Sequence, residues 1–421
     1  MKIDFPFPGY EFIPPVEVPD ANLMGVFSPP LDVEDIDEAA VLARGFAEPI
    51  AALRLRDNLR PAGRVLILVD DGTRGTPIPR LLQHVTAELA AANIPDKFVT
   101  ILTAQGTHRR MSEPELQRKL GDFYGRFHTR QHDWLDDSEL HEFGRTSDGT
   151  RVTANRLLAE HDFILGLGGI VPHRVKGFSG GAKIVFPGVS GREMMERNQW
   201  QASLLMSETV MGHPENPMRL RMEEAARLAG LKYIVNLVSD AAGRIVGCFA
   251  GDPVAAHREG CKLSRNVHAV RLPARADIVL TDAHPADRDF WQSAKGLYSG
   301  TMAVRRGGTL INIAPNPEGV AGNHPMLLEI GYRPHRDIVR MVDRGDVKDI
   351  VGAAILADVA QIIDHAECIQ VSPGMNRRDT ERLGMRYAAT PQEALDMAFA
   401  SQGPTATVAV LRYGGHVLPL T

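Results

Sequence analysis

Apolar residues in the first half of the chain gather in short continuous runs, and each run ends in a polar loop. Such runs occupy residues 64–69, 97–103 and 162–167. A continuous apolar run of this length is typical of a strand buried on both faces of a parallel sheet. After the first loop, apolar side chains recur at helical spacing from Ile78 to Leu89. The alternation of strand, polar loop and helix predicts βαβ units.

The same pattern continues in the second half of the chain. Further strands are predicted at residues 232–238, 244–249, 277–281, 309–313, 366–371 and 405–413. Residues 271–275 resemble a crossover between two units. We therefore expect two α/β domains with largely parallel sheets, an N-terminal one over residues 1–270 and a C-terminal one over residues 271–404. The last strand, within residues 405–421, could return to the first domain or complete the second.

Length and composition support this organisation and exclude several classes of protein. A chain of 421 residues is longer than one hydrophobic core usually organises. The net charge of −5 and the lack of a basic tract argue against a nucleic-acid-binding protein. Three widely spaced cysteines give neither a disulfide framework nor a zinc site, which favours the reducing cytoplasm. No stretch reaches the roughly 20 apolar residues of a membrane span, so we expect no membrane association.

Three loops that follow predicted strands carry side chains suited to acid/base chemistry. Arg74 follows the first strand, His108 the second, and a glycine-rich loop at residues 172–188 with His173 and Lys183 follows the third. Loops at the carboxyl ends of parallel strands meet at one edge of the sheet. Two histidines there would suit a reaction that needs a proton-transfer group on each face of a substrate carbon.

The C-terminal domain contributes a helix with a second polar cluster. Trp291 and Lys295 lie four residues apart, and Gln292 and Lys295 three apart, so all three side chains can point into one cleft. A cation from each domain, Arg74 and Lys295, would explain closure of the two domains on an anionic substrate.

Taken together, these loops resemble the nickel-dependent lactate racemase family. The motifs run in order from about residue 65 to residue 300 and comprise Asp71-Gly72-Thr73-Arg74, Gly106-Thr107-His108-Arg109, His173 with Gly180-Gly181-Ala182-Lys183 and Pro187-Gly188, Asn216-Pro217-x-Arg219, and Gln292-x-x-Lys295. The resemblance implies two α/β domains with the active site in the cleft between them. It also implies a nickel-pincer nucleotide, a pyridinium mononucleotide joined to a lysine as a thioamide, and enzymes that synthesise this cofactor as partners.

The resemblance assigns roles residue by residue. Lys183 falls on the tether, and His108 and His173 fall on the two acid/base histidines. Substrate contacts fall on Arg74, Gln292 and Lys295, and the helix spacing adds Trp291 as a further candidate; Asp71, Thr73, Gly180 and Gly181 are candidate cofactor contacts. One position departs from the family pattern, because Gln199 stands where the family has a nickel-binding histidine. An amide is a poorer nickel ligand than imidazole. Gln199 or water could complete the coordination, His213 could replace the missing histidine, or the protein could hold the cofactor weakly or not at all.

The sequence thus predicts a cytoplasmic racemase or epimerase of a 2-hydroxy acid that moves hydride to and from the tethered cofactor. Two alternatives remain open. One is a nickel-free enzyme of the same fold that uses the histidine pair for proton abstraction next to a carboxylate. The other is a hinged, non-catalytic protein that binds small carboxylates through Arg74 and Lys295.

Overall fold

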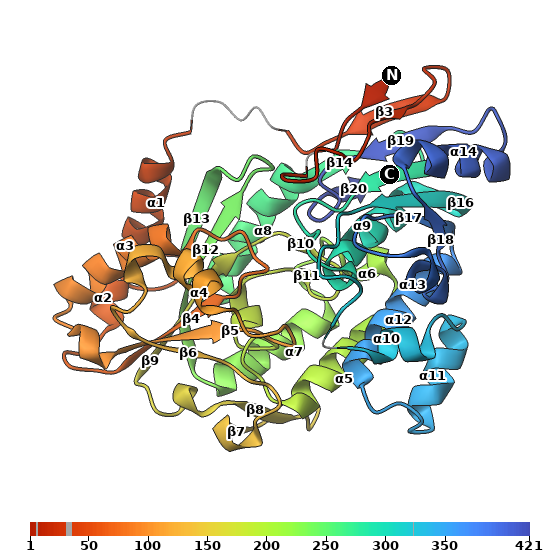
Figure 1. Ribbon diagram of the computed structural model, residues 1–421. Coiled ribbons are helices and arrows are strands. Elements are labelled where there is room, and N and C mark those ends of the chain that lie inside the picture. Colours follow the sequence, from red (N-terminus) through yellow and green to blue (C-terminus); the bar gives the residue numbers. More distant parts are fainter. Residues whose placement is uncertain (6, 31–35, 323) are drawn as a thin grey trace.

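The structure, a computed structural model, is built on two six-stranded sheets (Figure 1). It describes residues 1–5, 7–30, 36–322 and 324–421. The first sheet has the strand order β13 (Ile245–Gly251), β12 (Leu231–Ser239), β9 (Phe163–Gly169), β4 (Val65–Asp70), β5 (Val99–Ala104) and β6 (His128–Gln131). All neighbours in this sheet are parallel except β12 and β13.

Helices cover both faces of the first sheet, with α3 (Ile78–Ala91) on one and α7 (Pro217–Leu228) on the other. The other helices of this half are α1 (Glu38–Ala47), α2 (Leu55–Asn58), α4 (Glu113–Leu120), α5 (Arg192–Ser203), α6 (Ser207–Val210) and α8 (Ala255–His268). Alternate residues of β4 enter two different cores: Ile67 packs in the core that includes α3, and Leu68 in the core that includes α7. Burial on both faces explains why this strand is a continuous apolar run.

The second sheet is parallel throughout. Its strand order is β18 (Arg386–Ala388), β17 (Glu367–Val371), β16 (Val304–Ile313), β15 (Ala276–Asp282), β19 (Val408–Leu411) and β3 (Leu23–Phe27). Its helices are α9 (Phe290–Ala303), α10 (Met326–Ile330), α11 (His335–Asp343), α12 (Ile350–Ile363), α13 (Arg377–Arg382) and α14 (Pro391–Gln402). None of the described helices has the length and apolar character needed to cross a lipid bilayer.

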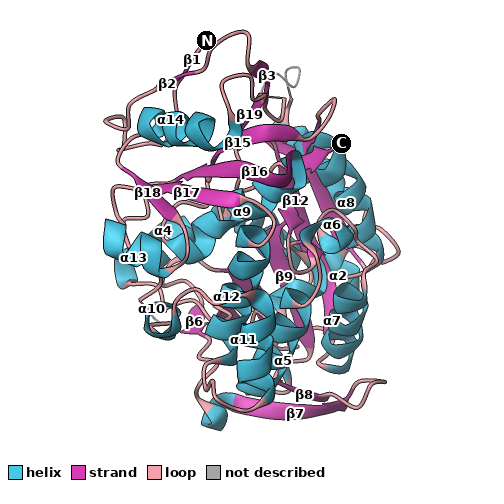
Figure 2. Ribbon diagram, turned by 90° about the vertical axis from the view of Figure 1, so that its right-hand side faces the viewer, coloured by secondary structure: helices cyan, strands magenta, loops and turns pink. Residues whose placement is uncertain are grey.

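Small paired segments and short 3-10 turns complete the fold. The pairs are β1 (Lys2–Ile3) with β2 (Val16–Glu17), β7 (Leu140–Arg145) with β8 (Arg151–Asn155), β10 (Pro172–His173) with β11 (Gly177–Phe178), and β14 (Ala269–Arg271) with β20 (Leu418–Leu420). The 3-10 turns are η1 (Asp96–Phe98), η2 (Gly121–Phe123), η3 (Asp137–Glu139), η4 (Arg156–Leu158) and η5 (Gly181–Ile184). Figure 2 shows the β7–β8 hairpin at the end of the molecule far from the second sheet.

The two ends of the chain both join the second sheet, which changes one expectation. β19 lies between β15 and β3, so the strand that could have returned to the first domain completes the second sheet instead. Residues 23–27 form the edge strand beside it, and the assignment of all of residues 1–270 to the first unit is therefore wrong for this strand. The rest of the proposed division at residue 270 stays a prediction.

Helices α5 and α12 hold the two halves together. The Gln361 amide on α12 donates to the carbonyl of Ser203 at the end of α5, at 2.6 Å. Trp200 on α5 packs against the core of the second sheet. A surface ion pair between Arg109 and Glu318, at 2.8 Å, adds a second link between the halves. The cleft between the two sheets is therefore closed in this structure.

Candidate functional site in the interdomain cleft

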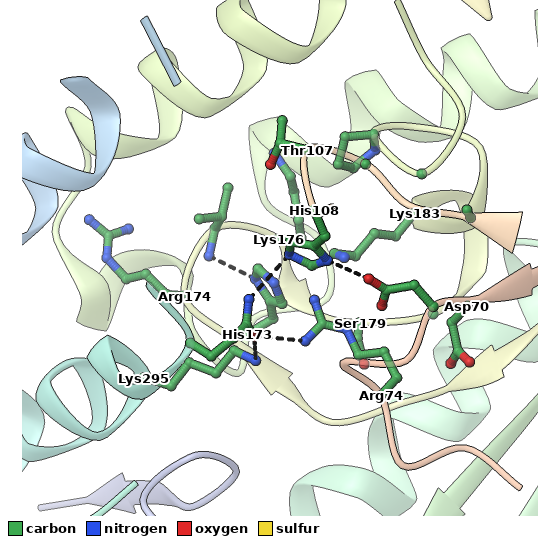
Figure 3. Close-up of a pocket in the computed structure, with 18 of the residues that line it drawn as sticks. Asp70, Arg74, Thr107, His108, His173, Arg174, Lys176, Ser179, Lys183 and Lys295 are labelled. Atoms are coloured by element: carbon green, nitrogen blue, oxygen red, sulfur yellow. Dashed lines mark hydrogen bonds and ion pairs between the residues drawn. The ribbon is translucent and has the colours of Figure 1, made fainter. Parts of the chain in front are cut away.

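A cavity of about 130 Å³ lies between the two halves of the molecule (Figure 3). The first half contributes the loops that follow β4, β5 and β9 together with α5, and the second half contributes α9 and α12. Parallel strands end at the same edge of a sheet, which brings the three loops together as the sequence predicts. Of the predicted site residues, the cavity is lined by Asp71, Arg74, His108, His173, Gly180, Lys183, Gln199, Trp291, Gln292 and Lys295.

The loop after β4 is fixed by two buried carboxylates. Asp71 Oδ1 accepts a hydrogen bond from the Thr73 hydroxyl at 2.6 Å, so Thr73 supports the site without lining the cavity. Asp70 pairs with Lys119 of α4 at 2.5 Å. The Lys119 ammonium also donates to the carbonyl of Arg74 at 3.0 Å. This buried lysine holds the backbone from which the Arg74 guanidinium enters the cleft.

His108 is held as a neutral ring with a defined proton position. Its Nδ1 lies 2.6 Å from Asp71 Oδ2, and its Nε2 lies 3.2 Å from the amide nitrogen of Gln292. Because the carboxylate accepts and the amide donates, the proton sits on Nδ1 and Nε2 carries the lone pair. Burial lowers the pKa of His108, and the attraction of Asp71 offsets this only in part. Nε2 is therefore the ring nitrogen that can accept a proton.

His173 ends β10 on the opposite loop and has the other arrangement. The backbone N–H of Val175 donates to its Nδ1 at 3.1 Å, which leaves the proton of the neutral ring on Nε2. Burial, followed by the charges of Lys183 and Arg74, lowers the pKa of His173 well below its ordinary value. The two rings thus differ in which nitrogen carries the proton.

Lys183 lies on η5 within a tightly packed glycine loop. Gly180 and Gly181 both have positive φ, and an added Cβ would lie 2.7 Å from Asn236 Oδ1 and 2.8 Å from the His257 ring, respectively. Gly181 does not line the cavity; its N–H donates to Asn236 Oδ1 at 2.7 Å. Burial and the nearby charge of Arg74 lower the pKa of Lys183 to about 7. A pKa this low favours the uncharged, nucleophilic form of the amine at a lower pH than for an ordinary lysine.

Arg219, from the Asn216-Pro217-x-Arg219 motif, anchors the same loop from below. Its fully buried guanidinium donates to the carbonyls of Gly180, at 3.0 Å, and of Lys176 and Phe178. Asn216 caps α7 by accepting from the Arg219 N–H at 3.0 Å. The motif therefore holds the backbone around the tether position and does not line the cavity.

The second half contributes a cationic pair bridged by an amide. Gln292 Oε1 accepts from Lys295 Nζ at 2.8 Å and from Arg74 Nη1 at 3.3 Å, so the two cations from different halves meet at one oxygen. Burial and the charge of Arg74 lower the pKa of Lys295 well below its ordinary value. Trp291 lines the cavity and stacks on His324 with ring centroids 4.5 Å apart. This arrangement can bind a carboxylate between Arg74 and Lys295.

Gln199 lines the cavity from α5, at the place where the sequence departs from its family pattern. His213 does not join it: the side chain is exposed and lies outside the cavity, so the suggestion that it reaches a metal there is wrong. The described residues contain no group of three or more histidines, cysteines and carboxylates placed to hold a metal ion.

The sequence did not point to four further residues at this site, Arg174, Lys176, Tyr298 and Asp358. Arg174 and Asp358 form a buried ion pair at 3.0 Å between the two halves. One signal was available, because Asp358 is the only charged residue of α12, whose other side chains are almost all apolar. A lone acid in such a helix is costly to bury unless it has a partner.

Two family models match the chain. The model of the lactate racemase N-terminal domain matches residues 12–211, and that of the lactate racemase C-terminal domain matches residues 272–418. Lactate racemase of Lactiplantibacillus plantarum is 28% identical over 389 residues, and lactate racemase of Thermoanaerobacterium thermosaccharolyticum is 28% identical over 393 residues. Each comparison covers 91% of this chain and 91% of the relative.

Solved structures have the same architecture. The lactate racemase apoprotein from Thermoanaerobacterium thermosaccharolyticum superposes with a TM-score of 0.87 at 26% identity, over 100% of both chains. A protein from Thermotoga maritima superposes with a TM-score of 0.73 at 19% identity, over 93% of this chain and 100% of that one, and this second likeness concerns the fold alone.

Proposed function

Because the chain belongs to the lactate racemase family of isomerases, we propose that it racemises or epimerises a 2-hydroxy acid with a lysine-tethered nickel-pincer nucleotide. The observation that carries this proposal is the meeting of two imidazoles, His108 and His173, with two cations, Arg74 and Lys295, in one cavity. The imidazoles serve the hydroxyl group, and the cations serve the carboxylate.

The residues around Lys183 fit a tethered nucleotide. The amine lines the cavity and its pKa is lowered to about 7, so it can form an amide-like bond more readily than a surface lysine. No side chain fits at Gly180 and Gly181, which keeps the backbone of this loop compact beside the tether. When bound, the cofactor supplies a hydride acceptor and donor, which protein side chains lack. Gln199 lines the cavity and, in this proposal, would contribute its side-chain amide to the nickel coordination.

The chain's own residues bind the substrate and move its proton. Arg74 and Lys295 hold the carboxylate and so fix the position of the adjacent carbon. Nε2 of His108 takes the hydroxyl proton, and Asp71 stabilises the imidazolium that forms. When the substrate is rebuilt with the other hand, the proton returns to its oxygen from His108, and the neutral ring of His173, on the opposite loop, donates a hydrogen bond to that oxygen from Nε2. The packing of α5 against α12 limits the access of water to the cavity during the reaction.

The proposal is tested with protein co-expressed with the pincer-synthesis enzymes. We expect intact-mass spectrometry to find an adduct on Lys183, and racemisation and solvent-hydrogen exchange with members of a panel of 2-hydroxy acids. Lys183→Ala should lose adduct and activity together, whereas Lys232→Ala, an exposed lysine on β12, should keep both. Full activity from unmodified Lys183 would rule out the tether.

The glutamine at position 199 favours one alternative function, that of a nickel-free enzyme of the same fold. An amide binds nickel more weakly than imidazole does. In that case the histidine pair would abstract a proton next to the substrate carboxylate without hydride transfer. Elemental analysis of the active, co-expressed protein separates the two functions, because activity without nickel supports the second.

A further inference from the structure

The cavity has more positive charge than the proposed reaction uses. Its lining carboxylates are all engaged: Asp70 by Lys119, Asp71 by His108, and Asp358 by Arg174. The lining cations are Arg74, Arg174, Lys176, Lys183 and Lys295. Under the proposed function, Arg74 and Lys295 hold one carboxylate and Lys183 becomes an uncharged thioamide. Arg174 is paired with Asp358, which leaves Lys176.

Lys176 is a buried amine without a partner. The residue is 0% exposed, and among the described residues its Nζ has no hydrogen-bond partner. Burial, followed by the charge of Lys183, lowers the pKa of its amine well below the ordinary value. A buried amine that donates no hydrogen bond is costly, and a ligand that supplies an acceptor removes this cost.

Lys176 lines the same cavity as the two acid/base histidines. Residues 174–176 form the turn between β10 and β11, in which His173 pairs with Gly177. Lys176 is therefore in the same tight hairpin as one of the two acid/base histidines. The carbonyl of Lys176 accepts from Arg219, at 3.3 Å, which fixes the base of this turn.

Among the described residues, no side chain hydrogen-bonds the Lys176 amine. Asp358 Oδ1 is held at 3.0 Å by Arg174, and the Tyr298 hydroxyl hydrogen-bonds the same carboxylate. The Arg174 guanidinium also donates to the carbonyls of Ala202 and Leu205, so its donors are committed to protein groups. Of the cations that line the cavity, Lys176 is therefore the one whose charge a group of the ligand can balance.

We infer that Lys176 binds a second anionic group of the ligand, and that the substrate of this site is a 2-hydroxy dicarboxylate. The inference rests on the proposed function and adds to it the substrate class. Arg74 and Lys295 take the carboxylate next to the reacting carbon, and Lys176 takes the carboxylate at the other end. In Figure 3, Lys176 is labelled between Arg174 and Lys183, beside the two histidines.

Binding to the apoprotein tests the inference without turnover. The probes are 2-hydroxybutanedioate and 2-hydroxybutanoate, which share a four-carbon chain and differ in one terminal carboxylate. We expect the diacid to bind the wild-type protein roughly 10- to 100-fold more tightly, as one charge-assisted hydrogen bond allows. Lys176→Met should abolish this preference and leave binding of the monoacid within about threefold. Lys262→Met removes a surface lysine paired with Glu259 and should change neither.

Equal affinities of the two probes for the wild-type protein, or a preference for the diacid that survives Lys176→Met, would overturn the inference. Lys176→Gln, which keeps a hydrogen-bond donor without the charge, is the second variant if the methionine variant does not fold; it should lower the preference by about tenfold. If Lys176→Met instead lowers the adduct on Lys183 in co-expressed protein and leaves the preference intact, the anionic group belongs to the cofactor, and the substrate class is refuted.

The outcome is separable from that of the proposed function. A wild-type protein that prefers the diacid but racemises neither acid supports the binding site and refutes the racemase. A wild-type protein that racemises the monoacid and shows no preference for the diacid supports the racemase and refutes the role of Lys176.

Discussion

Oδ2 of Asp71 lies 2.6 Å from Nδ1 of His108, and this contact decides which nitrogen of the ring can act as a base. Burial alone would raise the pKa of the Asp71 carboxyl, but His108, Arg74 and Thr73 hold it well below its usual range. Asp71 is therefore an anion that accepts the Nδ1 proton. Nε2 remains free of a proton and faces the side of the cleft from which Gln292 approaches.

Replacement of Asp71 by asparagine should remove this control. An amide can donate to Nδ1 and so favour the ring with its proton on Nε2, which cannot accept the substrate's proton. We expect kcat to fall roughly 100- to 10,000-fold, the usual contribution of a positioned base, with KM changed only a few-fold. Steady-state kinetics on protein that carries its full complement of cofactor measures kcat and KM separately. Asp122→Asn, at an exposed aspartate just after α4, is the matched control. An unchanged kcat in Asp71→Asn would mean that the contact does not orient the base.

The Lys183 amine of the apoprotein should react with acylating reagents at lower pH than other lysines. Its pKa is lowered to about 7, by burial and then by Arg74, whereas an exposed lysine titrates near 10.4. Only the uncharged amine reacts, so its rate should rise with a midpoint near pH 7 and level off above pH 8. Peptide mass spectrometry after brief acetylation follows each lysine separately. Exposed Lys262 in the same sample is the control, and coincident midpoints for the two lysines would contradict the prediction.

The apolar pattern predicted the strands best where both of their faces are buried. β4, β5 and β9 are continuous apolar runs because helices cover the sheet on both sides. Helix α4 begins with a capping box between Ser112 and Glu115. The apolar pattern did not predict β3, because it is an edge strand of five residues and none of them is fully buried. Which sheet β19 joins could not be read from the strand itself, since its partners are distant in sequence.

The candidate site was predictable where a residue follows a strand, and not where its role depends on a distant neighbour. Arg74, His108 and Lys183 were found because parallel strands bring their loops to one edge. Lys119 was missed because its partner, Asp70, is 49 positions earlier in the chain and only the folded structure joins them. The sequence shows Lys176 within the glycine-rich loop, but only the packed hairpin shows that its amine is buried without a hydrogen-bond partner.

Gln199→His should strengthen the retention of nickel. Gln199 lines the cavity from α5, and an imidazole there would give the metal a better donor than the amide. We expect co-expressed Gln199→His protein to keep about tenfold more nickel than the wild type after dialysis against a chelator, as measured by elemental analysis. Gln201→His is the control, because Gln201 lies on the same helix but bonds Arg221 outside the cavity. Equal gains in both variants would indicate adventitious binding by the new histidines.

Stability should fall in mild acid, and His132 should account for a measurable share of the loss. Its Nε2 donates to the carbonyl of Ser190 at 3.0 Å, and its Nδ1 accepts from the Asn155 amide at 3.3 Å, so the buried ring is satisfied only when neutral. Burial lowers its pKa to about 4, against roughly 6.5 in the unfolded chain. The native state therefore binds fewer protons than the unfolded state between these values. The stabilisation is complete above pH 6.5 and is lost as the pH falls towards 4, by an amount on the order of 3 kcal/mol.

His132→Gln removes this titration while keeping a donor and an acceptor in the same place. The midpoint of urea unfolding should decline less steeply between pH 6.5 and pH 4 in this variant than in the wild-type protein. His128→Gln, an exposed histidine on the neighbouring strand β6, should leave the wild-type slope unchanged. Parallel declines in wild type and His132→Gln would mean that the ring is already protonated in the native state. Ser190 lies at the end of the loop that begins at Lys183, so loss of its hydrogen bond to His132 should loosen this loop before the rest of the protein unfolds. Hydrogen exchange of the backbone amides of residues 183–191 should then be faster below pH 6.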